Sequence, residues 1–231
     1  MKWCRRNRYS TMFPELSIPK NARMGKKKIL QPTALKVLFD VDTRLYYGKL
    51  VFDEYIYAYR FAVATGVRPG ELVGLWYGDV KGNTVNLRRN INRLDEETTG
   101  KNENAIRTVV LHPLAAAELH AQLQQRAFEE EQPLRGDDPI FLLENEHSLY
   151  NYWQFYQRSN GIDPPVSLYE LRHTFVSIIE DAVSPAELRR MVGHSKSMDT
   201  YGWYSHAVDG RADTAAMAVS DALAEYSPRA K

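Results

Sequence analysis

The sequence predicts an α+β fold, in which a mainly helical domain carries a small antiparallel β-sheet. Two segments, 84–87 and 106–111, alternate apolar and polar residues as half-buried strands do, and a polar stretch with Gly100 separates them as in a hairpin. Most other segments space their apolar residues three or four apart, as amphipathic helices do. Hydrophobic residues at 44% and charged residues at 26% are ordinary for a globular domain.

Residues 1–31 form a basic segment that precedes the main domain. The pattern of residues 2–9 is typical of the end of a helix, and residues 20–31 form a linker. The segment has nine Lys and Arg against Glu15, a net charge of +8, whereas the whole chain carries only +1. Such an arm suits contact with phosphates, although a merely solvated arm has the same composition. The candidate phosphate contacts are Lys20, Arg23, Lys26, Lys27 and Lys28.

The main domain, residues 32–231, is expected to begin with two helices. Pro32 occupies a typical first helical position, and a row of apolar residues follows it. An aromatic-rich second helix is predicted over 50–65, with Gly66 as its end, because glycine readily adopts the left-handed conformation that closes helices. A short third helix should begin at Pro69.

The second half of the chain is predicted to be helical apart from a short extended piece at 139–142. A helix over 113–130 precedes that piece. Ser184 and Glu187 form a capping box at a helix start, and Gly193 marks the end of the same helix. The helices predicted after the extended piece cover 148–159, 167–181, 185–192, 197–204 and 208–225.

Cysteine content and hydropathy exclude several classes of protein. Cys4 is the only cysteine, so the chain can form no internal disulfide and no cysteine-based zinc site. No apolar run approaches the roughly 18 residues of a membrane span, and the N-terminus lacks the apolar region of a signal peptide. We therefore expect a cytoplasmic protein with no membrane partner.

Cations, imidazoles and a phenol recur at short intervals late in the chain. Arg172 and His173 stand in Leu-Arg-His-Thr-Phe, His194 in Val-Gly-His-Ser and Tyr204 in Trp-Tyr-Ser-His. Upstream, Arg68 stands in Ala-Thr-Gly-Val-Arg-Pro-Gly-Glu-Leu. Guanidinium forks bind two phosphate oxygens at once, and a tyrosine hydroxyl can attack phosphorus to form a phosphotyrosine ester. The set therefore predicts chemistry on a phosphodiester.

Each of these residues also has an ordinary structural interpretation. Arg68 is compatible with a surface arginine at a turn, where Glu71 would brace the arginine or cap the next helix. His173 alone fits a packed or capping histidine, and His194 alone fits a partner of the helix dipole. Tyr204 is one of fourteen tyrosines and is singled out by its position ten residues after His194.

In order and spacing, these motifs together resemble the catalytic domain of tyrosine recombinases, the phage-integrase family, from about Lys20 to Asp209. The segments that carry the resemblance are 64–72, 171–175, 192–195 and 203–206. Members of this family also carry a hairpin lysine six residues before an arginine, and Lys101 stands six residues before Arg107. The resemblance therefore implies that Lys101 is the general acid. The implied catalytic residues are Arg68, Lys101, Tyr169, Arg172, His194 and Tyr204.

One residue departs from the family's pattern. Tyr169 stands three residues before Arg172, where the family usually has histidine. A phenol can donate a hydrogen bond to phosphate but is a poor base near neutral pH, so Tyr169 is expected to keep a positioning role. His173, the residue after Arg172, is expected to contact DNA.

The resemblance also implies a domain organisation. Residues 1–31 would be the end of a core-binding domain and a basic linker, and residues 32–231 would be the catalytic domain. The rest of the core-binding domain has no counterpart in this sequence, so we expect weak DNA affinity from this chain alone. The stretch from Ala215 to Leu223 is expected to form a helix that docks on a neighbouring subunit, and packing on its own domain is the open alternative.

The implied function is that of a site-specific DNA recombinase, an integrase that cuts and rejoins strands through a 3′-phosphotyrosine intermediate to integrate or excise a mobile element. The reaction would need no metal, no ATP and no other cofactor. The implied partners are double-stranded DNA attachment sites, further copies of the chain in a tetramer, and accessory DNA-bending proteins. A bacterial or phage-encoded protein associated with the nucleoid would fit this role.

The residues leave three other functions open. A non-catalytic DNA-binding or assembly fragment would keep the fold without the reaction. A topoisomerase-like nickase would relax DNA without joining two sites. Whichever reaction applies, Tyr201 is also close enough in sequence to Tyr204 to replace it as the nucleophile. A metal-dependent nuclease would use Asp137 and Asp138, which also fit a solvated loop.

Overall fold

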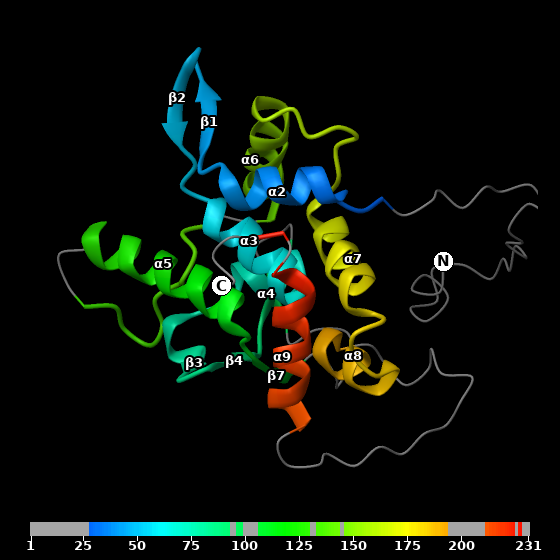
Figure 1. The fold of residues 1–231 in the computed structure, drawn as a ribbon. Coiled ribbons are helices and arrows are strands. Elements are labelled where there is room, and N and C mark those ends of the chain that lie inside the picture. Colours follow the sequence, from blue (N-terminus) through cyan, green and yellow to red (C-terminus); the bar gives the residue numbers. More distant parts are fainter. Residues whose placement is uncertain are drawn as a thin grey trace, which may run out of the picture.

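The chain folds around one buried helix, α3 (Ile56–Thr65), in a computed structural model (Figure 1). Nine of its ten residues are buried, because apolar side chains occur on every side of the helix. It packs against α2 (Pro32–Asp40), α4 (Pro69–Val73), α5 (Pro113–Glu129) and α7 (Leu168–Ile179). The structure describes residues 28–92, 96–98, 106–129, 133–143, 146–193, 211–224 and 226–227.

The antiparallel sheet confirms the predicted strands. β4 (Thr84–Leu87) pairs with β7 (Arg107–Val110) on one side and with β3 (Val80–Lys81) on the other. A short 3₁₀ helix, η1 (Tyr77–Asp79), leads into this sheet, and a separate pair is formed by β5 (Asn90–Ile91) and β6 (Glu97–Thr98). Together with the helices, these strands confirm the predicted α+β class. The predicted hairpin tip around Gly100 lies outside the described residues.

A second hairpin stands where the sequence predicted the first half of a helix. The prediction of one helix over 50–65 was wrong, because β1 (Thr43–Tyr46) pairs with β2 (Lys49–Phe52), and α3 begins only afterwards. Tyr47 and Gly48 form the turn with φ angles of 46° and 75°, and such turns match the twist of two adjacent strands. The hairpin projects from the body at the top of Figure 1.

α8 (Pro185–Val192) begins and ends at the predicted residues, and α7, predicted over 167–181, spans Leu168–Ile179. Ser167 caps α7, and Ser184 caps α8, each in a capping box with a glutamate three residues later. Gly193 ends α8 with a φ of 63°, in the left-handed region where glycine has no steric penalty. The backbone N–H of Gly193 donates back to the last turn, at Arg189 and Arg190.

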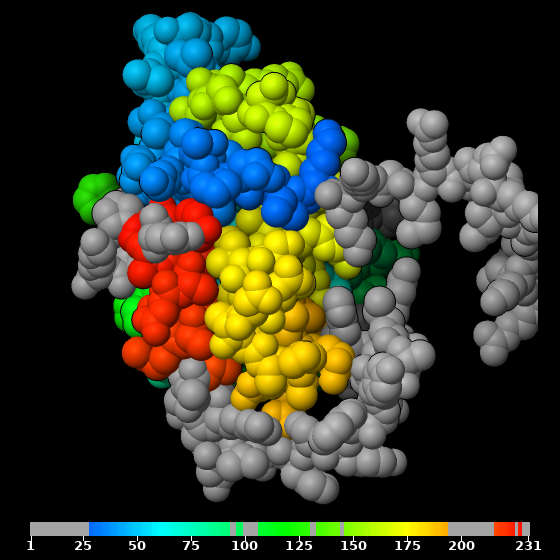
Figure 2. Space-filling model, turned by 45° about the vertical axis from the view of Figure 1, so that its right-hand side comes forward, coloured from blue at the N-terminus to red at the C-terminus, as the bar shows by residue number. Residues whose placement is uncertain are grey.

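The two remaining helices, α6 (Glu146–Ser159) and α9 (Arg211–Leu223), also match predicted segments. α9 lies beside α7 on one face of the molecule, where they are red and yellow in Figure 2. Its residues Ala215, Val219 and Leu223 are buried in the core of this same chain, whereas Met217 is exposed. Docking of α9 on another subunit stays a prediction, and the helix predicted over 197–204 lies outside the described residues.

Candidate active site

Two arginines from distant segments bind one buried carboxylate. Glu71, in α4, is only 3% exposed. Arg107 forms a fork on it, with Nη1 2.8 Å from Oε1 and Nη2 2.9 Å from Oε2. Arg68 donates to the same two oxygens, through Nη1 at 2.5 Å and through its backbone N at 2.8 Å. Both roles predicted for Glu71, bracing Arg68 and capping the helix, are therefore confirmed.

A third arginine, Arg172 of α7, lies beside this pair and is almost completely buried. Its Nη1 donates to the carbonyl of Gly66 at 2.7 Å, and its Nη2 donates to the carbonyl of Val192. Gly66 is the residue that ends α3, so the turn before Arg68 and the helix of Arg172 are joined directly. The ring of Phe175 packs against Gly66, where a Cβ atom would lie 2.3 Å from the ring.

The three guanidinium groups outnumber the one carboxylate, and the pKa values reflect this. Burial opposes the ionisation of Glu71, but the hydrogen bonds and charge of Arg107, with those of Arg68, outweigh it and hold its pKa below the ordinary value. Burial lowers the pKa of Arg172 to about 10, and the like charges of Arg68 and Arg107 add to the effect. The site is therefore positively charged at neutral pH and suited to an anion.

Tyr169 and His173 lie one turn apart on α7 and touch each other. Their ring centroids are 5.2 Å apart with an interplanar angle of 74°, which is an edge-to-face contact. Tyr169 is half exposed, at 45% of its surface. It stands three residues before Arg172 on α7, so the two side chains lie on neighbouring faces of the helix.

The basic segment enters the folded body next to α7. The backbone N of Lys28 donates to Glu170 Oε1 at 3.0 Å, and its Nζ lies 3.5 Å from the carbonyl of Pro165. Two residues later, the backbone N of Leu30 donates to the hydroxyl of Thr174 at 2.9 Å. The linker is therefore anchored on the same helix that carries Arg172.

Of the predicted site residues, the structure describes Arg68, Tyr169, Arg172, His173 and Lys28. It brings Arg68 and Arg172 to the same helix end, since Arg68 Nη2 donates to the carbonyl of Gly193 at 3.0 Å. The predicted residues outside the described ranges are Lys20, Arg23, Lys26, Lys27, Lys101, His194 and Tyr204.

Sequence reasoning used Arg107 only to locate Lys101 and missed its part in the site. The available signal was its place at the start of a strand, two residues before the buried Val109, which turns both side chains toward the same face. A second missed group surrounds Asp79, which binds Arg88 and Arg89, while Arg89 stacks 3.6 Å above the ring of Trp76.

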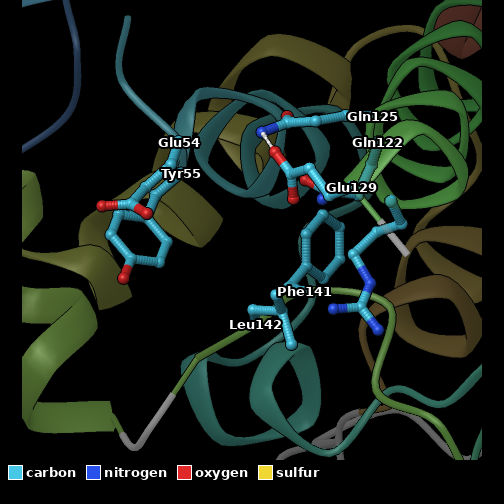
Figure 3. Close-up of a pocket in the computed structure, with 8 residues that line it drawn as sticks. Glu54, Tyr55, Gln122, Gln125, Glu129, Phe141 and Leu142 are labelled. Carbon is cyan, nitrogen blue, oxygen red and sulfur yellow. Dashed lines mark hydrogen bonds between the residues drawn. The ribbon is translucent and has the colours of Figure 1, made fainter. Parts of the chain in front are cut away.

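A surface pocket lies away from these residues, between the start of α3, the last turns of α5 and the loop of Phe141 (Figure 3). Gln125 and Glu129 are hydrogen-bonded to each other at 2.8 Å on its rim. None of the predicted site residues lines this pocket.

Asp137 and Asp138, the residues of the nuclease hypothesis, lie in a turn. Asp138 Oδ2 accepts a hydrogen bond from the backbone N of Arg135 at 2.6 Å, which gives this carboxylate a structural role. Within the described ranges, no three His, Cys, Asp or Glu side chains come together as metal ligands. In the same ranges, no helix has the length and apolar character needed to cross a bilayer.

Comparisons with known proteins agree on one family. A family model described as "Phage integrase family" matches residues 45–211. No curated protein matches the sequence. The integrase of transposon Tn1549, solved with transposon right-end DNA, superposes with a TM-score of 0.61 at 19% identity, over 84% of this chain and 66% of that chain.

Two other solved structures have the same fold. XerA recombinase gives a TM-score of 0.56 at 18% identity, over 91% of this chain and 68% of that chain. A lambda integrase dimer bound to a COC′ core site gives 0.52 at 14% identity, over 83% of this chain and 66% of that chain. The present chain thus aligns with about two thirds of each of these solved chains, of which the Tn1549 and lambda integrases were solved as residues 82–397 and 75–356.

Proposed function

Because the chain belongs to the phage integrase family, we propose that it is a site-specific DNA recombinase that cuts and rejoins DNA through a covalent tyrosine intermediate. The observation that carries the proposal is the group of three guanidiniums around Glu71. Arg68 and Arg172 come from segments 104 residues apart in sequence, yet both donate to the end of α8. Preorganised cations of this kind stabilise the negative charge that develops on a phosphodiester during attack.

In the proposed reaction, Tyr204 loses its phenolic proton to solvent water as its hydroxyl oxygen forms a bond to phosphorus, and the bond from phosphorus to the 5′ oxygen breaks. Arg68 and Arg172 hold the non-bridging oxygens of the phosphate. Lys101 gives its proton to the leaving 5′ oxygen, which leaves a 3′-phosphotyrosine and a free 5′ hydroxyl. A 5′ hydroxyl of a second duplex then attacks the phosphotyrosine, so bond energy is conserved without ATP or a metal.

The remaining site residues act around this step in the proposal. His194 follows Gly193, the residue that ends α8, and donates to the phosphate. Tyr169 orients the phosphate through its hydroxyl, since it stands three residues before Arg172 on α7 and a phenol is a poor base near neutral pH. His173 and the basic residues of the linker contact the DNA backbone. The proposed substrates are double-stranded attachment sites of a mobile element, bound by a tetramer with accessory DNA-bending proteins inside the cell.

Covalent trapping tests this function. The chain is incubated with a pool of nicked duplex oligonucleotides in the presence of a chelator and without nucleotide, and an SDS-resistant adduct is sought on a gel. We expect an adduct from the native chain and from Tyr201→Phe, and none from Tyr204→Phe, because only the Tyr204 hydroxyl would attack. An adduct that survives Tyr204→Phe would assign the nucleophile elsewhere, and an adduct that forms only when the chelator is omitted would indicate a metal-dependent reaction.

A second candidate function is a DNA-binding or assembly module without catalysis. The observation that favours it is the state of Arg172, whose two terminal nitrogens already donate to backbone carbonyls in a nearly buried position. DNA binding by the native chain without any adduct, in the trapping experiment above, would support this module over the enzyme.

A further inference from the structure

Three consecutive backbone carbonyls at the end of α8 each accept a hydrogen bond from a different arginine. Arg107 Nε donates to the carbonyl of Met191 at 2.9 Å, Arg172 Nη2 donates to that of Val192, and Arg68 Nη2 donates to that of Gly193 at 3.0 Å. The last carbonyls of a helix have no partners within the helix, and its end carries partial negative charge. The three arginines therefore supply, from other elements, the hydrogen-bond donors that the last carbonyls of α8 lack within the helix.

α8 is short and buries few of its side chains completely. It has eight residues, and Val192 is its one fully buried side chain, whereas α3 buries nine of ten residues and α7 buries six of twelve. So short a helix is marginal in isolation and takes its stability from contacts with the rest of the fold. Leu188 and Met191 are partly buried against the core, and the three arginine–carbonyl bonds add fixed points at the C-terminal end of the helix.

Arg107 is the member of this set that connects the parts. Its two terminal nitrogens donate to the carboxylate of Glu71, which also accepts hydrogen bonds from Arg68. Its Nε donates to the carbonyl of Met191. The β7 strand that carries it is paired in the three-stranded sheet. One side chain thus ties the sheet, the Arg68 turn and the end of α8 to one another.

We infer that Arg107 is a positioning residue, which fixes Arg68 and the last turn of α8 relative to each other. The inference rests on the proposed function, in which Arg68 and the residue after Gly193 both act on the phosphate. Arg107 does not need to touch DNA for this role, because its side chain is 8% exposed and is bound to Glu71 and Met191.

The role demands an arginine. A guanidinium offers a planar fork for the two oxygens of Glu71 and a further N–H in the same plane for the Met191 carbonyl. A lysine ammonium is a point charge and can keep the charge of the Glu71 pair, but it cannot reproduce the fork and the third bond together. Arg107→Lys should therefore preserve the fold while loosening α8.

Hydrogen exchange of the full chain without DNA tests the structural part of the inference. We expect Arg107→Gln to speed exchange of the amides over residues 188–193 by about tenfold or more, since one charge-assisted anchor is removed. Arg88→Gln is the matched control, because Arg88 also pairs with a buried carboxylate, Asp79, in the same region of sheet. It should leave exchange over 188–193 within about twofold of the native rate.

Three results would overturn the inference: native exchange over 188–193 in Arg107→Gln, an equal rise in the sheet and in α8, or the same rise in Arg88→Gln. If Arg107→Gln does not fold, the exchange of Arg107→Lys tests the positioning role instead, because the lysine keeps a positive charge beside Glu71 and should preserve the fold. A native exchange pattern in a folded Arg107→Lys would then reject the role, and faster exchange confined to 188–193 would support it.

Adduct formation with the nicked duplex pool tests the functional part. At saturating DNA, the single-turnover rate should fall about a hundredfold in Arg107→Gln, the usual cost of a small misplacement in a site, with partial recovery in Arg107→Lys. The dissociation constant for the pool should change less than about threefold, because the hydrogen bonds of Arg107 are internal to the protein. Equal losses of rate and affinity would indicate that Arg107 binds DNA directly instead. If the native chain forms no adduct, the proposed function fails and the exchange experiment still decides the positioning role.

Discussion

At the scale of single residues, Glu71 explains why so much positive charge can gather in one place. Its two oxygens accept four hydrogen bonds from Arg68 and Arg107, and the remaining guanidinium, that of Arg172, donates to two backbone carbonyls. A buried carboxylate with this many donors is held ionised despite its burial. Without it, three cations would face one another with no counter-charge.

Glu71→Gln should therefore destabilise the protein in a pH-dependent way. The folded pKa of Glu71 lies below its ordinary value, so its ionised form adds stability above that ordinary value, and this stability is lost as pH falls through the folded pKa. We expect the variant to lose about 3 kcal/mol in the free energy of unfolding at pH 7, and progressively less toward pH 3. Urea unfolding at both pH values measures this, and a constant difference would contradict the assignment.

The sequence predicted two of the three arginines and missed the third for a physical reason. Arg68 and Arg172 stand in motifs whose residue order is visible in one dimension. Arg107 acquires its partners only when β7 brings it to Glu71 and to the end of α8, 36 and 84 positions away. Contacts of that range depend on the whole fold, and local pattern does not contain them.

At the scale of elements, the local sequence predicted both ends of α8 but failed to predict the β1–β2 hairpin. Ser184 and Gly193 were predictable, because a cap and a left-handed stop involve only neighbouring residues. The β1–β2 hairpin was missed, because only Asp53 and Glu54 separate the apolar run from Leu50 to Phe52 from the apolar sequence of α3, and two polar residues fit within one amphipathic helix. The turn at Tyr47 and Gly48 decides the matter, and it lacks the Asn-Gly or Asp-Gly pair that signals such turns.

Gly66→Ala tests the joint between α3 and α7. The added Cβ would meet the Phe175 ring at 2.3 Å in a backbone with a φ of 66°, so both strain and overpacking oppose it. We expect a loss of about 3 kcal/mol in the free energy of unfolding. Gly82→Ala is the matched control, because Gly82 has a φ of 56° but nothing within 4 Å, and it should lose only about 1 kcal/mol. Equal losses would show that packing on Phe175 is unimportant.

At the scale of the whole molecule, charge is divided between the linker and the body. Residues 1–31 carry +8, and the whole chain carries +1, so the body carries −7. The linker joins that body beside Arg172, through the bonds of Lys28 and Leu30 to α7. Composition revealed this division, but the point of attachment follows only from the three-dimensional arrangement around α3.

Salt dependence of DNA binding tests the linker. Replacing Lys26, Lys27 and Lys28 with Gln should reduce the slope of log affinity against log salt by about 0.9 for each phosphate that a lysine no longer neutralises, or roughly 3 in all. The matched control replaces the exposed Lys36, Lys49 and Lys81 of the body, with the same change in net charge. Equal slopes for the two triple variants would show that net charge alone matters and that the linker has no special role in binding DNA.

The burial of α3 also constrains how the protein can be made. Its cover includes α7, and bonds such as those from Arg172 to Gly66 and from Leu30 to Thr174 join residues 106 and 144 positions apart. Before the ribosome has added α7, the nascent chain contains α3, which has apolar side chains on every side, without one of the helices that bury it. Completion of the core therefore waits until α7 has been synthesised, and until then the exposed apolar surface makes the chain prone to aggregation.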